Sequence, residues 1–175
     1  MDDIRITEIT AEALDAHLPA LAEITKATVD DGAAISFVHP FTLDDAEAFW
    51  RESVAPKMVR GEKVLLGAFI DDRVVGTVQL DLAMPPNQPH RCEVAKMAVH
   101  PAYRRRGIGR ALMLAIEAEA RKAGKTLMTL DTRTDDLAQG LYGSVGFEIA
   151  GVIPYFALDP DGQSTHGTTY MYKPL

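Results

Sequence analysis

The chain has 175 residues, of which 47% are hydrophobic, and a formal net charge of −7. This length and composition predict a single domain over residues 1–175 with a substantial core. The acidic balance argues against a nucleic-acid partner, which would need a basic surface. The single cysteine, Cys92, excludes an internal disulfide and a multi-cysteine metal site, and it fits a reducing compartment. No run approaches about 18 apolar residues and the start Met1-Asp2-Asp3 is acidic, so we expect no membrane partner and a cytoplasmic location.

The amino-terminal part of the chain predicts a strand and two helices. Residues 4–9 alternate apolar and polar side chains, which is typical of a half-buried strand. We expect Thr10 to cap the next helix, in which leucines recur at helical spacing. After a predicted loop over 32–40, Thr42-x-x-Asp45 forms a capping-box variant that opens the second helix.

The middle of the chain predicts an antiparallel hairpin followed by a strand and a helix. Residues 64–70 and 74–82 are apolar and rich in β-branched side chains, and a short acidic turn separates them. Residues 84–91 contain three prolines and predict a loop before a strand over 93–99. A helix then follows, and Gly124 is expected to end it.

The last third predicts strands over 126–131, 147–152 and 168–173, a short helix over 135–144, and a long loop over 153–167. The mixture of helices and strands predicts the α+β class. The segment from 93 to 131 has the order strand, helix, strand, which predicts a right-handed βαβ unit. Ligands of such units bind beyond the carboxyl ends of the strands.

A charged, glycine-containing turn joins the first strand of this unit to its helix. It runs Tyr103-Arg104-Arg105-Arg106-Gly107-Ile108-Gly109-Arg110-Ala111-Leu112. Glycines without a Cβ allow backbone N–H groups to approach a phosphate, and the helix dipole favours negative charge there. The turn lacks the third glycine of GxGxxG and the Gly-Lys-Ser/Thr of a P-loop, so it predicts a diphosphate ligand of another kind.

The spacing Arg104-x-x-Gly107-x-Gly109 resembles the pyrophosphate-binding signature of the Gcn5-related N-acetyltransferases. The resemblance extends over nearly the whole chain. Three segments resemble the tabtoxin-resistance acetyltransferase group within that family: Arg91-Cys92-Glu93-Val94, Leu130-Asp131-Thr132 and Pro160-Asp161-Gly162. The resemblance implies a central mixed, mostly antiparallel twisted sheet of about seven strands, flanked by about four helices. It also implies acetyl transfer from acetyl-CoA.

The family resemblance implies a set of residues that bind the coenzyme. The main chain of the strand would pair with the pantetheine arm, and the turn would hold the pyrophosphate. The expected cofactor-binding residues are Met97, Ala98, Val99, Arg104, Arg105, Arg106, Gly107, Ile108, Gly109, Arg110 and Ala111. No metal is expected, because the histidines show no metal-ligand spacing.

Three residues are candidates for catalysis. An alkylammonium must lose a proton before it attacks, and Glu93 and Asp131 end up on adjacent strands of the predicted unit, where either carboxylate could accept that proton. The alternatives are that Glu93 faces solvent or pairs with Arg91 or Lys96, and that Asp131 caps the next helix. Tyr142 resembles the family tyrosine whose hydroxyl approaches the coenzyme sulfur. Its alternative role is core packing.

The acceptor is expected to be a small primary amine, such as a toxic amino acid or an antibiotic-like metabolite. Candidate substrate-contacting residues are Phe37, Glu93, Asp131 and Tyr155. A protein or peptide N-acetyltransferase and a non-catalytic acyl-CoA sensor are the alternative functions. The protein is expected to be a monomer or a homodimer.

Overall fold

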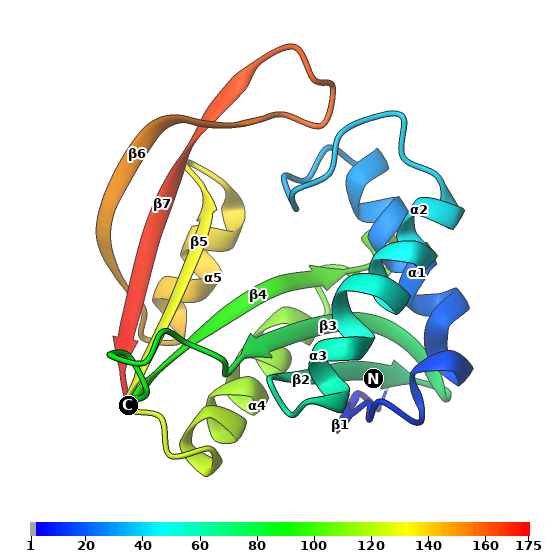
Figure 1. Ribbon diagram of the computed structural model, residues 1–175. Coiled ribbons are helices and arrows are strands. Elements are labelled where there is room, and N and C mark those ends of the chain that lie inside the picture. The colour runs from blue at the N-terminus through cyan, green and yellow to red at the C-terminus, as the bar shows by residue number, and fades with distance from the viewer. Residues whose placement is uncertain (1–2) are drawn as a thin grey trace.

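A twisted seven-stranded sheet runs through residues 3–175, the part of the chain that this computed structural model describes (Figure 1). Its strands lie in the order β1-β2-β3-β4-β5-β7-β6. Their bounds are β1 Arg5–Glu8, β2 Lys63–Ile70, β3 Arg73–Asp81, β4 Arg91–Val99, β5 Leu127–Arg133, β6 Glu148–Leu158 and β7 Thr165–Pro174. Only β4 and β5 pair in parallel, which confirms the predicted mixed, mostly antiparallel sheet. Met1 and Asp2, which begin the acidic start noted above, lie outside the described residues.

Four helical bodies flank the sheet within residues 3–175. They are α1 Leu14–Asp30, the continuous run of α2 Leu43–Ala48, the π-helix η1 Phe49–Val54 and α3 Ala55–Val59, then α4 Ile108–Lys122 and α5 Leu137–Ser144. A 3-10 turn, η2 Pro101–Tyr103, follows β4. The α+β class and the helix count are therefore as predicted.

The two predicted caps had different outcomes. The expectation that Thr10 caps α1 is wrong, because a turn intervenes and the helix begins at Leu14 with Ala13 as its N-cap. The carbonyl of Thr10 instead accepts the Ala13 N–H at 3.1 Å. The capping box of α2 is confirmed: Thr42 Oγ1 accepts the Asp45 N–H at 3.1 Å, and Asp45 Oδ2 accepts the Thr42 N–H at 2.8 Å.

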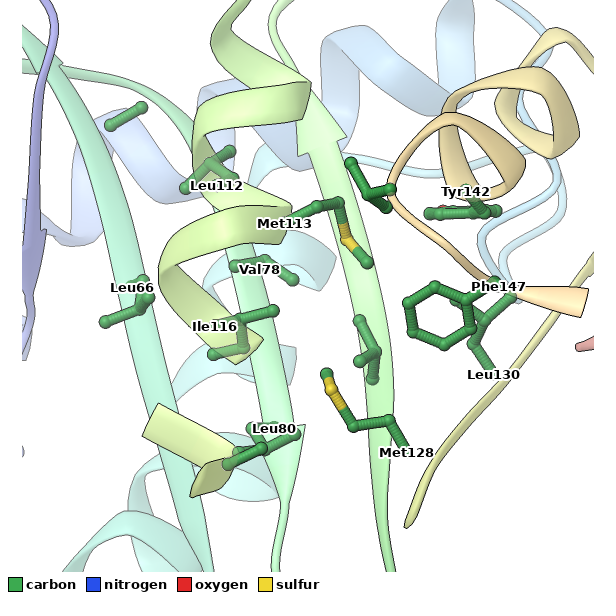
Figure 2. Close-up of a cluster of buried hydrophobic side chains, with 14 of the residues drawn as sticks. Leu66, Val78, Leu80, Leu112, Met113, Ile116, Met128, Leu130, Tyr142 and Phe147 are labelled. Atoms are coloured by element: carbon green, nitrogen blue, oxygen red, sulfur yellow. The ribbon is translucent and has the colours of Figure 1, made fainter. Parts of the chain in front are cut away.

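Buried apolar side chains fill both sides of the sheet. On one side, here called the α4 face, Leu112, Met113 and Ile116 of α4 pack against β2, β3, β4 and β5 (Figure 2). On the other side, the α1 face, leucines of α1 pack with Trp50 against β2 and β3. Trp50 Nε1 donates a hydrogen bond to Thr25 Oγ1 at 3.0 Å, which ties the second helical body to α1.

The predicted loop over 153–167 is wrong. Strands β6 and β7 both continue into this segment, and only residues 159–164 connect them. The interruption that resembled a loop is a register shift between Ile153 and Ala157, where Pro154 and the positive φ of Tyr155 break the alternation. Because β6 is the edge strand of the sheet, a proline there removes no essential ladder bond.

Candidate active site

The start of α4 presents free backbone donors. Gly107 is the N-cap and adopts the left-handed region at φ 81°. The first bond closing the helix runs from the Ala111 N–H to the Gly107 carbonyl at 3.0 Å, so the N–H groups of Ile108, Gly109 and Arg110 have no intrahelical acceptor. This end of α4 can therefore bind an anion through its backbone and its dipole.

Three arginines of the turn are engaged within the protein. Arg104 pairs with Asp31 and donates to the Val99 carbonyl. Arg110 donates to the Ser144 carbonyl at 3.1 Å, and the guanidinium of Arg106 lies 5.2 Å from the centre of the Tyr103 ring. These contacts hold the turn between α1, β4 and α5, and the exposed side chain of Arg105 lies beside them.

One edge of β4 is left without a strand neighbour. The ladder between β4 and β5 covers only Arg91–Glu93 against Leu127–Thr129, although both strands continue further. In the segment 97–99 beyond the bulge, Ala98 and Val99 pair on one side only, with β3. The opposite edge offers N–H and C=O groups that an extended amide-containing ligand can pair with, as a peptide pairs with a sheet edge. Gly109 allows α4 to approach this strand and α5, because a Cβ there would lie 3.0 Å from Leu141 Cδ2.

A bulge in β4 decides which side chains reach the α1 face. Gln79 of β3 pairs with Ala95, but Thr77 pairs with Ala98, so β4 carries one extra residue between them. Lys96 lies in this bulge with φ 50°. As a result Glu93 before the bulge and Ala98 after it both point toward α1, despite their odd and even numbers.

The two predicted carboxylates share the α1 face. Met128 and Leu130 of β5 point into the α4-face core, so the alternating Asp131 points to the opposite face, as Glu93 does. Glu93 pairs with Arg91 at 3.1 Å, which is one of its predicted alternatives. Asp131 accepts a hydrogen bond from Thr168 Oγ1 at 3.0 Å. The alternative role of Asp131 as a helix cap is wrong, because Asp136 caps α5.

Two lysines on the same face were not among the predicted site residues. Lys63 Nζ lies 2.8 Å from Asp81 Oδ1 and 2.6 Å from Gln79 Oε1, and its side chain is almost fully buried. Lys96 Nζ donates to Ser36 Oγ at 2.9 Å and lies 5.9 Å from the centre of the Phe37 ring. Lys63 and Asp81 occupy positions that strand alternation assigns to the α1 face, and this pattern in the sequence could have identified them as site residues. The position of Lys96 depends on the bulge, which no pattern in the sequence predicted.

Tyr142 lies in the core between α5 and the sheet, with Phe147 beside it (Figure 2). It is 7% exposed, and the two ring centres are 6.2 Å apart. Burial first, and then the charges of Asp136 and Asp131, raise the pKa of its hydroxyl well above the usual range. The predicted packing role is therefore present. The negative charge of the candidate base Asp131 is therefore close enough to affect the pKa of this hydroxyl.

The structure places the remaining substrate candidates differently. Phe37 stacks on Phe41 with ring centres 4.5 Å apart and lies next to Lys96, so it belongs to the α1-face group. Tyr155 is 83% exposed on the edge strand β6, and the structure gives it no contact with Glu93 or Asp131. The loop before α2 meets the β6–β7 turn, where the His39 N–H donates to the Pro160 carbonyl at 2.8 Å.

Two features are absent from residues 3–175: a cluster of metal ligands and a helix that could span a membrane. No group of three or more histidine, cysteine or carboxylate side chains in this range could hold a metal ion. None of the helices described there is both long enough and apolar enough to cross a membrane.

Comparison with known proteins identifies the class of this chain. The model of the acetyltransferase (GNAT) family matches residues 27–147, and the chain belongs to that family. Over 134 residues it is 28% identical to a protein of Azospirillum brasilense described as an uncharacterized N-acetyltransferase in the hisH-hisA intergenic region. That alignment covers 73% of this chain and 77% of the relative. The family predicted from the arginine-glycine turn is thus confirmed, and the narrower tabtoxin-resistance resemblance stays a prediction.

Solved structures share the fold over almost the full chain. A ribosomal-protein-alanine N-acetyltransferase from Brucella melitensis is 25% identical, with a TM-score of 0.81 and coverage of 98% of this chain and 99% of the other. A Salmonella typhimurium protein solved with its cofactor acetyl-CoA is 22% identical, with a TM-score of 0.79 and coverage of 98% and 94%. The predicted fold is confirmed.

Proposed function

We propose that the protein transfers an acetyl group from acetyl-CoA to the primary amine of a small molecule, by direct attack in a ternary complex. One arrangement carries the proposal. The free edge of β4 ends at the anion-binding start of α4, and Glu93 and Asp131 lie on the α1 face of the two strands that separate there. Binding both reactants at this point would supply orientation, which contributes much of the acceleration of a two-substrate reaction.

The residues present fit acetyl-CoA. The free N–H groups of Ile108, Gly109 and Arg110 suit the diphosphate, and the unpaired backbone edge of residues 97–99 suits the amides of the pantetheine arm. When bound, acetyl-CoA supplies an acetyl group activated as a thioester. The fit depends on backbone groups, so it does not require the side chains of Arg104 or Arg110, which hold the turn.

Asp131 is the better placed of the two carboxylates to accept a proton. An alkylammonium has a pKa of about 10, so a base is needed at neutral pH. Glu93 is already paired with Arg91, whereas Asp131 accepts only the neutral Thr168 hydroxyl among the hydrogen bonds of residues 3–175. We assign Asp131 as the base. We assign Glu93 a supporting role, in which its negative charge contributes to the electrostatic environment of Asp131. Burial and the charges of Asp136 and Asp131 raise the pKa of Tyr142, so its hydroxyl keeps its proton and would donate a hydrogen bond to the sulfur of the departing coenzyme.

A small acceptor fits this chain better than a peptide. The hydrogen bond between His39 and Pro160 joins the loop before α2 to the β6–β7 turn, and we infer that this link limits the room for an extended peptide. The similarity to a ribosomal-protein-alanine N-acetyltransferase supports the alternative of a protein acceptor. A non-catalytic acyl-CoA sensor would need the turn that leads into α4, here called the α4 turn, but neither Asp131 nor Tyr142.

The proposal is tested by thiol release from acetyl-CoA with amino acids, polyamines, aminoglycosides and basic peptides as acceptors. Coenzyme binding is measured in parallel by calorimetry. We expect binding, and turnover with a small amine that Asp131→Asn greatly reduces. Turnover confined to peptides would establish the protein-acetyltransferase alternative. Binding without turnover would favour the sensor, and no binding would contradict the assignment of the α4 turn.

A further inference from the structure

The charged side chains on the α1 face do not all find partners of opposite charge. Three cations and three carboxylates meet there: Lys63, Arg91, Lys96, Asp81, Glu93 and Asp131. Lys63 pairs with Asp81 at 2.8 Å, and Arg91 pairs with Glu93 at 3.1 Å. Among residues 3–175, no carboxylate lies within 4.0 Å of Lys96 Nζ, and no lysine or arginine nitrogen lies within 4.0 Å of the Asp131 carboxylate. Of these six side chains, Lys96 and Asp131 are therefore the two without a partner of opposite charge.

Both remaining charges are fixed in place by neutral hydroxyls. Ser36 Oγ accepts from Lys96 Nζ at 2.9 Å, and Thr168 Oγ1 donates to Asp131 at 3.0 Å. The two charged residues belong to β4 and β5, which are the two strands that separate beyond Glu93. Each hydroxyl orients its charge without neutralising it, so both charges remain available to a ligand held between the strands.

The surroundings of Lys96 make a bound anion favourable. Burial first, and then the positive charge of Lys63, lower the pKa of Lys96, while the charges of Asp131, Asp81 and Glu93 oppose that shift. A partly buried cation without a charged partner is unfavourable, and a carboxylate at hydrogen-bond distance would offset this. Asp131 offers the complementary interaction to an ammonium group.

We propose that the acceptor is a zwitterion of the amino-acid type, whose carboxylate binds Lys96 while its amine lies at Asp131. This inference rests on the proposed function, because it assigns Asp131 to the reacting amine. Lys96 is then the residue that determines specificity for an acid next to the amine. A polyamine or an aminoglycoside would leave Lys96 without a partner and add a further cation beside it.

The test compares amino acids with their carboxamides. The probes are glycine, the standard L-amino acids other than proline and cysteine, β-alanine and γ-aminobutyrate, each beside its own carboxamide, with kcat and KM measured by thiol release. The ammonium group of a carboxamide loses its proton more readily than that of the free acid, so chemical reactivity alone favours the carboxamide. We expect the opposite preference, with at least one acid exceeding its carboxamide in kcat/KM by about tenfold or more, as loss of a charge-assisted hydrogen bond predicts.

Variants of Lys96 separate charge recognition from a structural role. Lys96→Met keeps an unbranched side chain of nearly the same length and should abolish the preference for the acid, mainly through KM, while Lys96→Arg should retain it. Lys122→Met removes the same charge at the exposed end of α4 and should leave the preference unchanged. Thermal unfolding and acetyl-CoA binding of each variant show whether the fold and the coenzyme site persist.

The outcomes separate this inference from the proposed function. Transfer to carboxamides or simple amines as efficient as transfer to acids would overturn the inference and leave the proposed function standing. An unchanged acid preference in Lys96→Met would also overturn it. No transfer to any amine would overturn the proposed function, and the inference would fail with it.

Discussion

Tyr142 combines a packing role with a phenol that holds its proton tightly. Burial, and then the negative charges of Asp136 and Asp131, raise the pKa of its hydroxyl. The group therefore stays protonated through the neutral and mildly alkaline range, where a proton donor is useful. We expect Tyr142→Phe to lower kcat by about 100-fold, which is within the usual range for loss of one hydrogen-bond donor to a developing negative charge. Steady-state kinetics measures this effect, and calorimetry should show little change in the Kd for acetyl-CoA.

The phenylalanine variant is a matched test because it retains the ring that packs beside Phe147. Its unfolding temperature should stay close to that of the parent protein. If kcat is equal in the two proteins, Tyr142 contributes to core packing and has no role in catalysis.

Asp131 and Glu93 differ in their partners, and this difference predicts different kinetic effects. Asp131→Asn removes the proposed base, so kcat/KM should fall by about 100-fold or more near neutral pH. Glu93→Gln leaves Arg91 without its carboxylate partner and should have a smaller effect. The measurement is the pH dependence of kcat/KM for the three proteins. Superimposable profiles for Asp131→Asn and the parent would remove the assignment.

At the scale of elements, the start of α4 depends on one glycine in the left-handed region. Gly107 has φ 81°, and a Cβ built there would meet no atom within 4 Å. A side chain would therefore add backbone strain without a clash. We expect Gly107→Ala to lower the free energy of unfolding by about 1 kcal/mol, and Gly107→Asn by less, because asparagine tolerates this conformation better. Urea denaturation measures both; equal stability of all three proteins would show that the turn relaxes to negative φ.

The elements that the sequence predicted well carry their signals locally. The capping box of α2 needs only Thr42 and Asp45, and the helical spacing of α4 with Gly124 after it is also local. Two of the wrong predictions have different causes, one local and one dependent on a distant strand. The start of α1 followed a three-residue turn after Thr10, and β6 continued past Pro154 because β7 pairs with it on the other side of the break.

At the scale of the whole molecule, the candidate site unites residues from Ser36 to Thr168. The sequence predicted Glu93 and Asp131 because each belongs to a strand of one βαβ unit. It could not predict Lys96, since a one-residue bulge determines which face each side chain of β4 takes. It offered the pairing of Glu93 with Arg91 as an alternative, but it could not predict that Arg91 would also donate to Thr129 on the next strand. Such pairings follow from register, which residue patterns specify only indirectly.

An ion pair between α4 and β7 connects the middle of the chain to its carboxyl-terminal strand. Glu117 accepts a hydrogen bond from Lys173 Nζ at 2.5 Å and pairs with Arg121 at 2.9 Å. Burial tends to raise the pKa of Glu117, but the hydrogen bonds and charges of Lys173 and Arg121 outweigh it and lower the pKa below its usual value. A carboxyl group with a lowered pKa in the folded protein contributes stability above its unfolded pKa, and this contribution is lost as the pH falls through the folded pKa.

Replacement of Glu117 should therefore destabilise the protein in a pH-dependent way. At pH 7 we expect Glu117→Gln to lower the free energy of unfolding by about 1.5–3 kcal/mol, as for loss of hydrogen bonds to a charged group. The difference from the parent should be constant above a pH of about 4.3 and shrink below it, because Glu117 of the unfolded parent chain then binds a proton before the folded carboxylate does. Glu119→Gln, which breaks only a pair with the exposed Lys122, should change stability by less than about 1 kcal/mol. Thermal unfolding of the three proteins between acid and neutral pH measures these differences, and a Glu117→Gln effect that persists unchanged in acid would assign the loss to packing instead of charge.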